Sequence, residues 1–540
     1  MPVNGMSIIA GRASTDTAAP FHSLNPATGE GSRHAYHAAS SAEVDVAARA
    51  AADSFDEYAA HPSESKAAFL ERCASEIASL GDDLVEMACW ETGLAGPRIA
   101  GERDRTVNQF RFFAAMVRDG GWVEAVIDRG DPTRKPMPRP DLRRMLRPLG
   151  PVAVFGASNF PLAYSAGGGD TASALAAGCP VVVKGHPSHP GTGEMVAWAI
   201  ARAAGECGLP GGVYGYLHAG GMREFDVGRE LITHPGVRAA GFTGSPSGGM
   251  SLANLGASRP DPIPVFSEMG SVNPVFVLPG AATADGEAIA AKLHASVTNS
   301  TGQMCTCPGL VFVARSSSSE AFVRSLGARI DATASSVMLS PRIRDAYLRR
   351  VGEMATAAGV GVAVVGEGLG SSRGEVAASG VLARPSMLTT TFEAFVRDRT
   401  LREECFGPSI VVVWCDEAEQ FIEAARAIDG SLTGTIWADA GSEPDRVLAG
   451  RLTTALERKA GRLIFNGVPT GVEVVGAMVH GGPFPATNQP QTSAVGTLAV
   501  RRWCRPVCFQ NYPGDLLPTE LADGNPGRIT RMEDGRLVVP

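Results

Sequence analysis

The sequence lacks the marks of a membrane protein, an exported protein and a nucleic-acid-binding protein. No apolar run approaches the ~20 residues that a membrane-spanning helix needs. The N-terminal stretch has no Lys or Arg ahead of its short apolar run, so it does not predict a signal peptide. Its 48 Lys and Arg residues are outnumbered by 56 Asp and Glu residues, which gives a net charge of −8. Because a mildly acidic chain has no electrostatic footprint for nucleic acid or anionic lipid, we expect neither nucleic acid nor a membrane as a partner.

Cysteine is also sparse, with ten residues in 540. That density is far below a disulfide scaffold, and without an export signal it favours a reducing, cytoplasmic location. The 64 Gly and 37 Pro residues show no collagen-like period, and the hydrophobic fraction of 44% is that of a folded protein. A chain of this length is too long for one compact core, so we expect two to four lobes.

Proline interrupts the pattern once, early in the chain. Residues 40–120 carry apolar side chains at three- and four-residue spacing, which predicts helices. Residues 128–144 then combine four prolines with a run of Arg and Lys, which neither a helix nor a central strand tolerates. We interpret this segment as an exposed arm, and both a subunit contact and a plain surface loop remain open for it.

From residue 150 onward, short apolar runs alternate with helical stretches. Runs such as PVAVFG (151–156) and PVVVKG (180–185) are typical of strands buried on both faces. A second such region begins near 270 and includes a run at 360–368, and the tail after 487 is expected to add an edge strand. The alternation predicts an α/β fold with largely parallel sheets, whose ligands bind at the carboxyl ends of the strands.

Cys305 is the most informative cysteine. It lies in a small, polar, Gly-bounded loop, NSTGQMCTCPG, between a predicted helix and a predicted strand. A nucleophilic cysteine needs access and nearby backbone N–H donors, which such a turn supplies, although a loop cysteine is more often inert. Cys307 forms a C-x-C pair with it, but no second Cys/His cluster is nearby to complete a zinc site, so we expect no metal.

Four further polar residues end or follow apolar strands. Glu268 and Glu404 are carboxylates at such positions, and each is either functional or a strand-end charge that reaches solvent. Asn159 has a side-chain amide that suits an oxyanion. Lys184 is either a solvated strand end or a ligand of cofactor hydroxyls or phosphate.

Together these motifs resemble the NAD(P)-dependent aldehyde dehydrogenase superfamily. The resemblance covers nearly the whole chain and is specific because six motifs occur in the family's order. They are FGASNFP, VVKGHPSHPGTG, GFTGS, SEMGSVNP, GQMC and EECFGP. It implies an aldehyde-dehydrogenase-like fold with two doubly wound parallel-sheet lobes and a small β oligomerisation extension.

The resemblance also implies the catalytic roles. Cys305 attacks the aldehyde carbonyl to give a thiohemiacetal, and Asn159 with the backbone N–H of Cys305 stabilises the oxyanion. Hydride transfer to the nicotinamide leaves a thioester, and Glu268 activates the water that hydrolyses it. A thiolate suits this work because it is a good nucleophile, and a carboxylate suits the base.

The same resemblance assigns the cofactor contacts. Glu404 holds the nicotinamide ribose with Phe406 beside the ring, Lys184 binds the adenosine ribose, and Gly244-Ser245 approach the pyrophosphate at a helix N-terminus. A G-x-G-x-x-G motif is missing after the first strand, and this superfamily binds its dinucleotide without one.

One departure from the family pattern concerns the choice between NAD and NADP. NAD-preferring members usually carry an acidic residue three positions after the lysine, where this chain has Pro187. Without that carboxylate a 2′-phosphate meets no repulsion and finds Lys184, with His186 or Ser188 and a second partner in Arg223. We therefore expect NADP to be preferred, with NAD also accepted.

A narrower resemblance is to 2-oxoglutarate semialdehyde (2,5-dioxopentanoate) dehydrogenases. It is carried by residues 139–184, by HGGPFPATN (480–488) in place of the usual glycine-rich motif, and by the tail. NADP-dependent medium- and long-chain aldehyde dehydrogenases share several of these features and are the alternative. Arg111 is a candidate for the acidic substrate or a helix-surface residue, and its neighbours Phe110, Phe112 and Phe113 suit an apolar tunnel equally well. A catalytically silent relative is a third hypothesis. It is weakened because Asn159, Glu268, Cys305 and Glu404 are all present.

The domain boundaries follow from the same comparison. We expect a cofactor-binding domain in 1–127 and 149–269, a catalytic domain in 270–486, and an oligomerisation arm and tail in 128–148 and 487–540. The implied assembly is a homodimer or homotetramer, with the arm and a strand near 494–503 as contacts.

Overall fold

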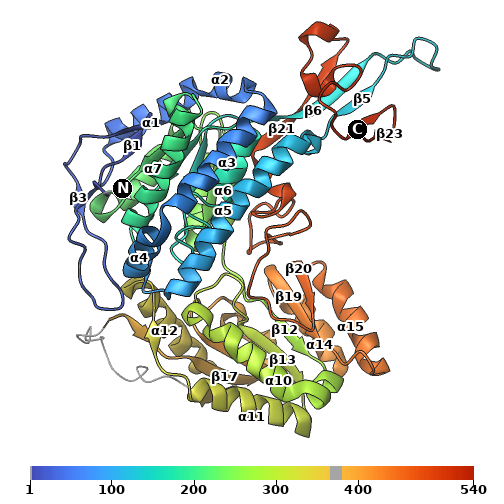
Figure 1. Cartoon of the computed structure of the whole chain (residues 1–540). Coiled ribbons are helices and arrows are strands. Elements are labelled where there is room, and N and C mark those ends of the chain that lie inside the picture. The colour runs from blue at the N-terminus through green and yellow to red at the C-terminus, as the bar shows by residue number, and fades with distance from the viewer. Residues whose placement is uncertain (1–2, 365–379) are drawn as a thin grey trace.

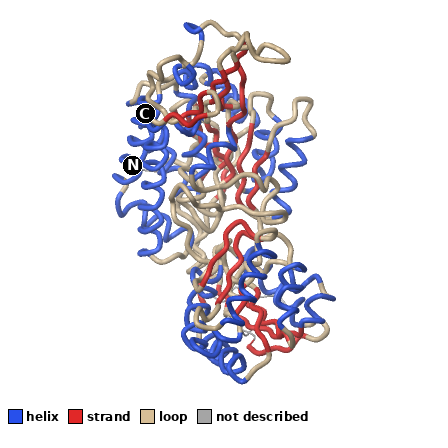
Figure 2. Tube along the Cα trace, turned by 90° about the vertical axis from the view of Figure 1, so that its right-hand side faces the viewer, coloured by secondary structure: helices blue, strands red, loops and turns tan. Residues whose placement is uncertain are grey.

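The computed structural model describes residues 3–364 and 380–540. The molecule has two α/β lobes, one below the other in Figure 1, and a small β arm that projects from the upper lobe. In both lobes a sheet lies between layers of helices, which the turned view in Figure 2 shows as strands flanked by helical tubes. Among residues 3–364 and 380–540, no helix has both the length and the apolar character needed to cross a membrane.

The upper sheet has the strand order β11-β10-β7-β8-β9-β1-β2. Its strands are β7 (Val152–Phe155), β8 (Val181–Lys184), β9 (Tyr214–Leu217), β10 (Ala239–Thr243), β11 (Val265–Glu268), β1 (Ile8–Ile9) and β2 (Arg12–Ala13). The five strands from β11 to β9 are parallel, and β1 adds an antiparallel edge. Runs such as β8 are buried because helices cover both faces of the sheet.

Nine helices belong to this lobe in the described chain. They are α1 (Ser41–Asp53), α2 (Phe55–Ala60), α3 (Ser63–Ser79), α4 (Gly81–Thr92), α5 (Gly96–Asp119), α6 (Gly169–Ala177), α7 (Pro190–Glu206), α8 (Glu224–Thr233) and α9 (Pro246–Ala257). The first five fall in the region where apolar spacing predicts helices. A short pair, β3 (Pro20–Phe21) and β4 (Tyr36–His37), precedes them.

The lower sheet has the order β15-β17-β18-β13-β12-β19-β20. Its strands are β12 (Val275–Val277), β13 (Leu310–Ala314), β15 (Val360–Val364), β17 (Ser386–Thr391), β18 (Ser409–Cys415), β19 (Ser431–Trp437) and β20 (Ala460–Phe465). Only β15 pairs antiparallel among these. The last four residues of the run expected at 360–368 lie outside the described residues.

Six helices cover the lower sheet in the described chain. They are α10 (Pro279–Thr298), α11 (Ser317–Asp331), α12 (Pro341–Ala355), α13 (Phe392–Arg397), α14 (Ala418–Ala427) and α15 (Glu443–Leu456), with the pair β14 (Ser336–Val337) and β16 (Leu382–Ala383) at one side. The α/β fold of two mostly parallel sheets predicted from the sequence is confirmed, with antiparallel strands at two sheet edges.

The arm is a third sheet, with the order β21-β6-β5-β22-β23. Its strands are β5 (Val126–Asp128), β6 (Leu142–Pro148), β21 (Cys504–Gln510), β22 (Arg531–Glu533) and β23 (Arg536–Val538). The proline-rich segment and the C-terminal tail therefore lie in one sheet, because β6 pairs with β21 over seven residues.

The strand expected near 494–503 is wrong in position. Residues Thr497–Trp503 form a 3-10 segment, and the strand begins at Cys504. The cause is Trp503, which is fully buried and donates its ring N–H to the Ser173 hydroxyl at 2.8 Å. Arg502 beside it is buried too and pairs with Asp170. These residues are anchored in the upper lobe, so only the chain after them is free to join the arm.

Candidate active site

The loop that carries Cys305 has an unusual backbone. Ser300, Thr301 and Gly302 all have φ between 52° and 64°, and a Cβ at Gly302 would meet the backbone of Gly407 at 2.3 Å. Three successive left-handed residues turn the chain sharply out of α10. The Asn273 side chain then donates to the Cys305 carbonyl at 2.8 Å and fixes the loop beyond the turn. The loop is therefore held on both sides of Cys305.

Glu268 is the last residue of β11 and is 2% exposed. Its backbone forms an isolated bridge with Thr487, from the segment that replaces the usual glycine-rich motif. Its Oε1 lies 3.0 Å from Nε2 of His480. Its Oε2 is buried and has no hydrogen-bond partner in the described chain. One carboxylate oxygen is thus engaged and the other remains available to a small polar molecule.

His480 is a site residue that the sequence did not identify. It is 2% exposed, and its Nε2 lies 3.6 Å from Sγ of Cys305 as well as beside Glu268. One carboxylate oxygen of Glu268, the sulfur of Cys305 and one ring nitrogen of His480 all lie within 4.8 Å of one another. The signal available was the departure of residues 480–488 from the family motif, but 175 residues separate the histidine from the cysteine.

The surroundings of Cys305 oppose its ionisation. Burial raises the pKa of its thiol well above the ordinary value, and the carboxylates of Glu268 and Glu404 raise this pKa further. The Arg105 guanidinium acts in the opposite direction but is a smaller influence. A thiol in this setting needs a neighbouring base to become a nucleophile at neutral pH.

Asn159 follows β7 and is 8% exposed. Its side-chain amide donates to the carbonyl of Gln303, two residues before the cysteine, at 3.0 Å. Its own carbonyl accepts from Arg98 at 2.7 Å, and Arg98 is in turn paired with the buried carboxylate of Glu102. The amide keeps a second N–H beside the Cys305 loop, which matches its predicted role as an oxyanion donor.

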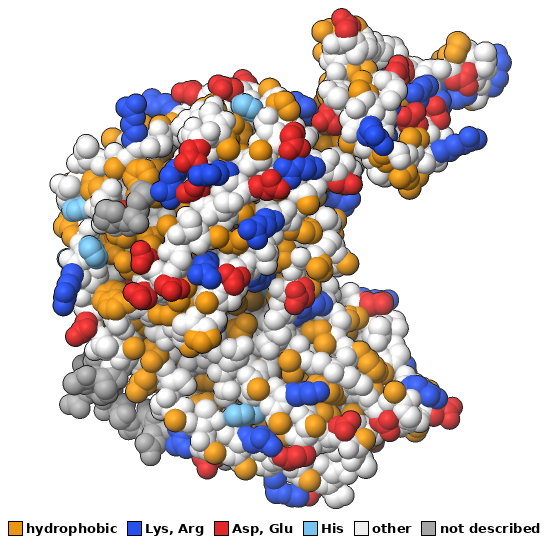
Figure 3. All heavy atoms as spheres, viewed as in Figure 1, with side chains coloured by type: hydrophobic (Ala, Val, Ile, Leu, Met, Phe, Trp, Pro, Cys, Tyr) orange, Lys and Arg blue, Asp and Glu red, His pale blue; other side chains and the backbone are white. Residues whose placement is uncertain are grey.

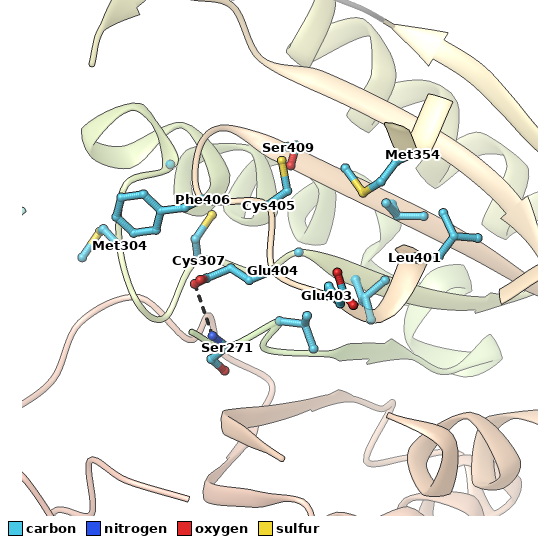
Figure 4. A pocket seen from close by; sticks show the side chains of 15 residues that line it. Ser271, Met304, Cys307, Met354, Leu401, Glu403, Glu404, Cys405, Phe406 and Ser409 are labelled. Carbon is cyan, nitrogen blue, oxygen red and sulfur yellow. Dashed lines mark hydrogen bonds between the residues drawn. The ribbon is translucent and has the colours of Figure 1, made fainter. Parts of the chain in front are cut away.

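Glu404 and Phe406 line a pocket to which the cysteine loop contributes Met304 and Cys307. Figure 4 shows Phe406 beside Met304 and the Glu404 carboxylate beside Cys307. Burial raises the pKa of Glu404 to about 7, and the backbone N–H of Ser271 donates to it at 3.2 Å. The pocket contains the two residues predicted to contact the nicotinamide riboside, but Cys305 does not line it.

The N-terminus of α9 fits a pyrophosphate. Ser245 caps this helix by accepting from the N–H of Gly248. Gly244 leaves no room for a side chain, because a Cβ there would lie 2.7 Å from the Phe242 ring. Exposed backbone N–H groups at a helix N-terminus attract phosphate, so Gly244 and Ser245 suit the predicted contact.

Lys184 ends β8, and burial lowers its pKa to about 8. Next to it, burial lowers the pKa of His186 well below its ordinary value, and the charges of Lys184 and Arg342 contribute to that shift. Arg342, at the start of α12 in the lower lobe, also lies over the Phe225 ring at 5.9 Å. Sequence reasoning missed Arg342, since nothing local in the chain links it to β8. Ser188 donates its backbone N–H to His186 at 3.2 Å.

Arg223 was predicted to bind a phosphate, but its guanidinium is already bound to other groups of the protein. It forms a salt bridge with Glu230 at 2.9 Å and donates to the carbonyl of Ala39 at 3.0 Å and 3.1 Å. The cation that faces His186 from the other lobe is Arg342.

Two arginines face Cys305, and neither is Arg111, the candidate named from the sequence. Arg105 on α5 donates to the Tyr164 hydroxyl at 3.3 Å, and its Nη1 is buried with no partner in the described chain. Arg462 on β20 is held by the carbonyls of Gly471 and Pro469, and Cys305 and Tyr164 both act on its pKa, which burial lowers. Neither arginine forms a salt bridge with an acidic residue of the described chain.

Arg111 and its aromatic neighbours lie elsewhere. Arg111 is exposed on the outer face of α5, because six residues after Arg105 the helix has turned by about 240°. Phe110 and Phe113 are fully buried in the core of the upper lobe, and Phe112 packs against that core. The tunnel interpretation of these three residues is therefore wrong.

Comparison with known proteins shows the family. The model of the family described as "Aldehyde dehydrogenase family" matches residues 13–482. The chain belongs to the aldehyde dehydrogenase family. This aldehyde dehydrogenase is 44% identical over 99% of its length to the whole of alpha-ketoglutaric semialdehyde dehydrogenase 2 of Azospirillum brasilense. It is 42% identical to alpha-ketoglutaric semialdehyde dehydrogenase of Acinetobacter baylyi, with 99% of both chains covered.

Solved structures agree on the fold of this aldehyde dehydrogenase. PnpE, solved in complex with nicotinamide adenine dinucleotide, superposes with a TM-score of 0.78 at 21% identity, over 94% of this chain and 97% of that one. A 3,6-anhydro-L-galactose dehydrogenase superposes with a TM-score of 0.77 at 22% identity, over 94% and 99%. The family recognition and the prediction of an aldehyde-oxidising enzyme are confirmed, which removes the silent-relative hypothesis. The family uses NAD(P).

Proposed function

We propose that this enzyme oxidises 2-oxoglutarate semialdehyde to 2-oxoglutarate with NADP. The names of the two relatives above 40% identity support the substrate. The observation that carries it is the pair Arg105 and Arg462, two cations near Cys305 that form no salt bridge with a carboxylate of the described chain. Both arginines are half-buried, and Nη1 of Arg105 is buried without a partner in the described chain, which is costly unless an acceptor pairs with it. A substrate with a distal carboxylate brings such an acceptor. An aliphatic aldehyde brings none.

The reaction starts at Cys305. Its sulfur attacks the aldehyde carbon, and the resulting oxyanion is held by the Asn159 side chain and the Cys305 backbone N–H. A dinucleotide held by Glu404, Phe406, Lys184 and the N-terminus of α9 would supply the hydride acceptor for oxidation of this thiohemiacetal to a thioester. Glu268 then takes a proton from water through its unpartnered Oε2, and the hydroxide displaces the sulfur to give the carboxylate.

The substrate assignment predicts a charge-specific effect of Arg105. We expect R105M to lower kcat/KM for 2-oxoglutarate semialdehyde by about 10- to 150-fold, since a hydrogen bond to a charged group is worth about 1.5–3 kcal/mol. For a neutral aldehyde of similar length, such as pentanal, kcat/KM should change little. R111M removes the same charge from the solvent face of the same helix and serves as the matched control.

The outcomes separate the alternatives. An equal loss with both aldehydes would mean that Arg105 has only a structural role. A wild-type kcat/KM that is higher for decanal than for the semialdehyde would favour the medium- and long-chain alternative.

The preference for NADP rests on the charges around Lys184. Lys184 and Arg342 supply two cations, His186 supplies a donor, and Pro187 stands where an acidic residue would repel a 2′-phosphate. One acidic group opposes them, because Glu224 at the head of α8 faces Lys184 and raises its pKa. The two positive charges and one negative charge sum to +1, which favours binding of the 2′-phosphate of NADP.

This balance predicts opposite effects of two substitutions. R342M should reduce the ratio of kcat/KM for NADP to that for NAD, and E224Q should increase it, each by about tenfold for one charged contact. Because the pKa of Lys184 is about 8, its charge is lost above that pH, so kcat/KM for NADP should fall there while that for NAD stays nearly level. K184M should abolish this pH dependence; a wild-type preference for NAD would overturn the proposal.

We also propose that the arm joins copies of this chain in a dimer or tetramer. The strand β21 pairs with β6 on one side only, and Met137, Tyr512 and Leu537 are exposed apolar residues of the arm. Figure 3 shows apolar and charged side chains mixed on this projection. Elution as a monomer in size-exclusion chromatography with light scattering would count against the assembly.

All ten cysteines are free thiols, which agrees with the cytoplasmic location we propose.

A further inference from the structure

The cluster of Cys305, His480 and Glu268 contains an imidazole that the family's roles leave without a task. Nε2 of His480 lies between two partners, 3.6 Å from the sulfur and 3.0 Å from the carboxylate. The ring is held from behind, because the His480 backbone N–H donates to Ser493 at 2.9 Å and the Tyr164 ring lies 5.8 Å away. The imidazole is therefore positioned to exchange a proton with the thiol while it remains in contact with the carboxylate.

We propose that His480 is the general base that takes the proton from the thiol of Cys305, and that Glu268 stabilises the imidazolium so formed. The step uses the neutral tautomer that carries its hydrogen on Nδ1 and a lone pair on Nε2. The S–H bond breaks, its electron pair stays on sulfur as the thiolate, and the proton binds Nε2. The Nε2–H then lies between two negative groups, the thiolate and Oε1. When the thioester is hydrolysed, the same N–H donates to the departing thiolate.

Other groups around the cysteine do not fill this role. Glu404 comes from the loop before β18, and its carboxylate raises the pKa of the thiol. Arg105 from α5 and Arg462 from β20 are cations and accept no proton. The pKa of Tyr164 is raised, so this group remains a phenol. The Glu268 carboxylate also acts on the thiol and raises its pKa, but its Oε1 contacts His480 and its Oε2 has no partner in the described chain, so we assign Oε2 to the hydrolytic water. Two proton acceptors therefore serve two different steps.

The proposal is tested without substrate, so its outcome is independent of which aldehyde the enzyme oxidises. Alkylation of Cys305 by iodoacetamide is followed by peptide mass spectrometry between pH 6 and 10. For H480Q we expect a rate about 100-fold lower at pH 7, the scale of general-base assistance, that approaches the wild-type rate as pH rises. Cys508 is an exposed thiol in the same chain and is the internal control, because its alkylation should not change.

Two further variants give readouts that a purely structural histidine would not move. In H480A, added imidazole should restore Cys305 alkylation at pH 7, while having no effect on Cys508. In the H480Q background, E268Q should accelerate alkylation, because without the imidazolium the carboxylate only repels the thiolate. Thermal melting and cofactor binding report folding, and H480N replaces H480Q if the latter does not fold. An unchanged pH profile in the folded variant, or loss of alkylation in E268Q alone, would overturn the proposal.

Discussion

C305S is expected to lower kcat for aldehyde oxidation by about 10⁴-fold or more, the scale seen when an enzyme loses its nucleophile. Serine is nearly isosteric with cysteine, but its hydroxyl ionises far less readily than a thiol. The fold should be unaffected, since the loop is held by the Asn273 side chain and by the turn at residues 300–302 rather than by the sulfur. Steady-state absorbance of the reduced cofactor measures the loss.

The control for this substitution is C508S, which makes the same change at an exposed thiol of the arm. It should retain wild-type turnover and melting temperature. Turnover in C305S close to that of the wild type would contradict the thioester mechanism, whichever aldehyde is used.

For E268Q we expect a burst of reduced cofactor with nearly the wild-type amplitude, followed by a steady-state rate about 10²- to 10⁴-fold lower. Hydride transfer precedes hydrolysis, and only the second step requires Oε2 to accept a proton from water. An amide at this position keeps the shape of the side chain but accepts no proton. Stopped-flow absorbance separates the two phases.

The size of the E268Q burst also bears on His480. A retained burst agrees with a thiol that is activated by the imidazole, whereas a lost burst would show that Glu268 activates the thiol itself. In either case the variant should melt near the wild-type temperature, because Glu268 keeps its backbone contacts with Gly244 and Thr487.

Much of the fold could be read from local patterns. β8 and β18 are runs of Val that only a sheet covered on both faces accommodates, and the helices between strands show clear apolar spacing. The 3-10 segment before β21 could not be read, because its apolar residues look like a strand until Trp503 is seen in the core. Burial of one large side chain, rather than local propensity, determined that conformation.

The residues of the site likewise fall into those that the sequence indicated and those that only packing identifies. Asn159, Glu268 and Cys305 each sit at a strand end or in a Gly-bounded turn, so sequence context marked them. Arg105 and Arg111 lie on the same helix and have the same chemistry, and only packing determines which one faces the cysteine. The sequence offered Arg111 as a candidate with a helix-surface residue as the alternative, and the second is confirmed. It did not indicate Arg105, because nothing in α5 itself identifies the lobe that covers it.

The sequence by itself determined the α/β class and the family's motifs, and it predicted Cys305 as the nucleophile, because each depends on a few consecutive residues whose chemistry is costly anywhere else. Only the tertiary structure decided which distant groups serve them. His480 reaches Cys305 because the segment 480–488 runs beside the edge strand β11, and Arg342 reaches His186 because the two lobes meet there. Such contacts join residues more than a hundred positions apart, and the free energy that fixes them comes from packing the two lobes and not from any local segment.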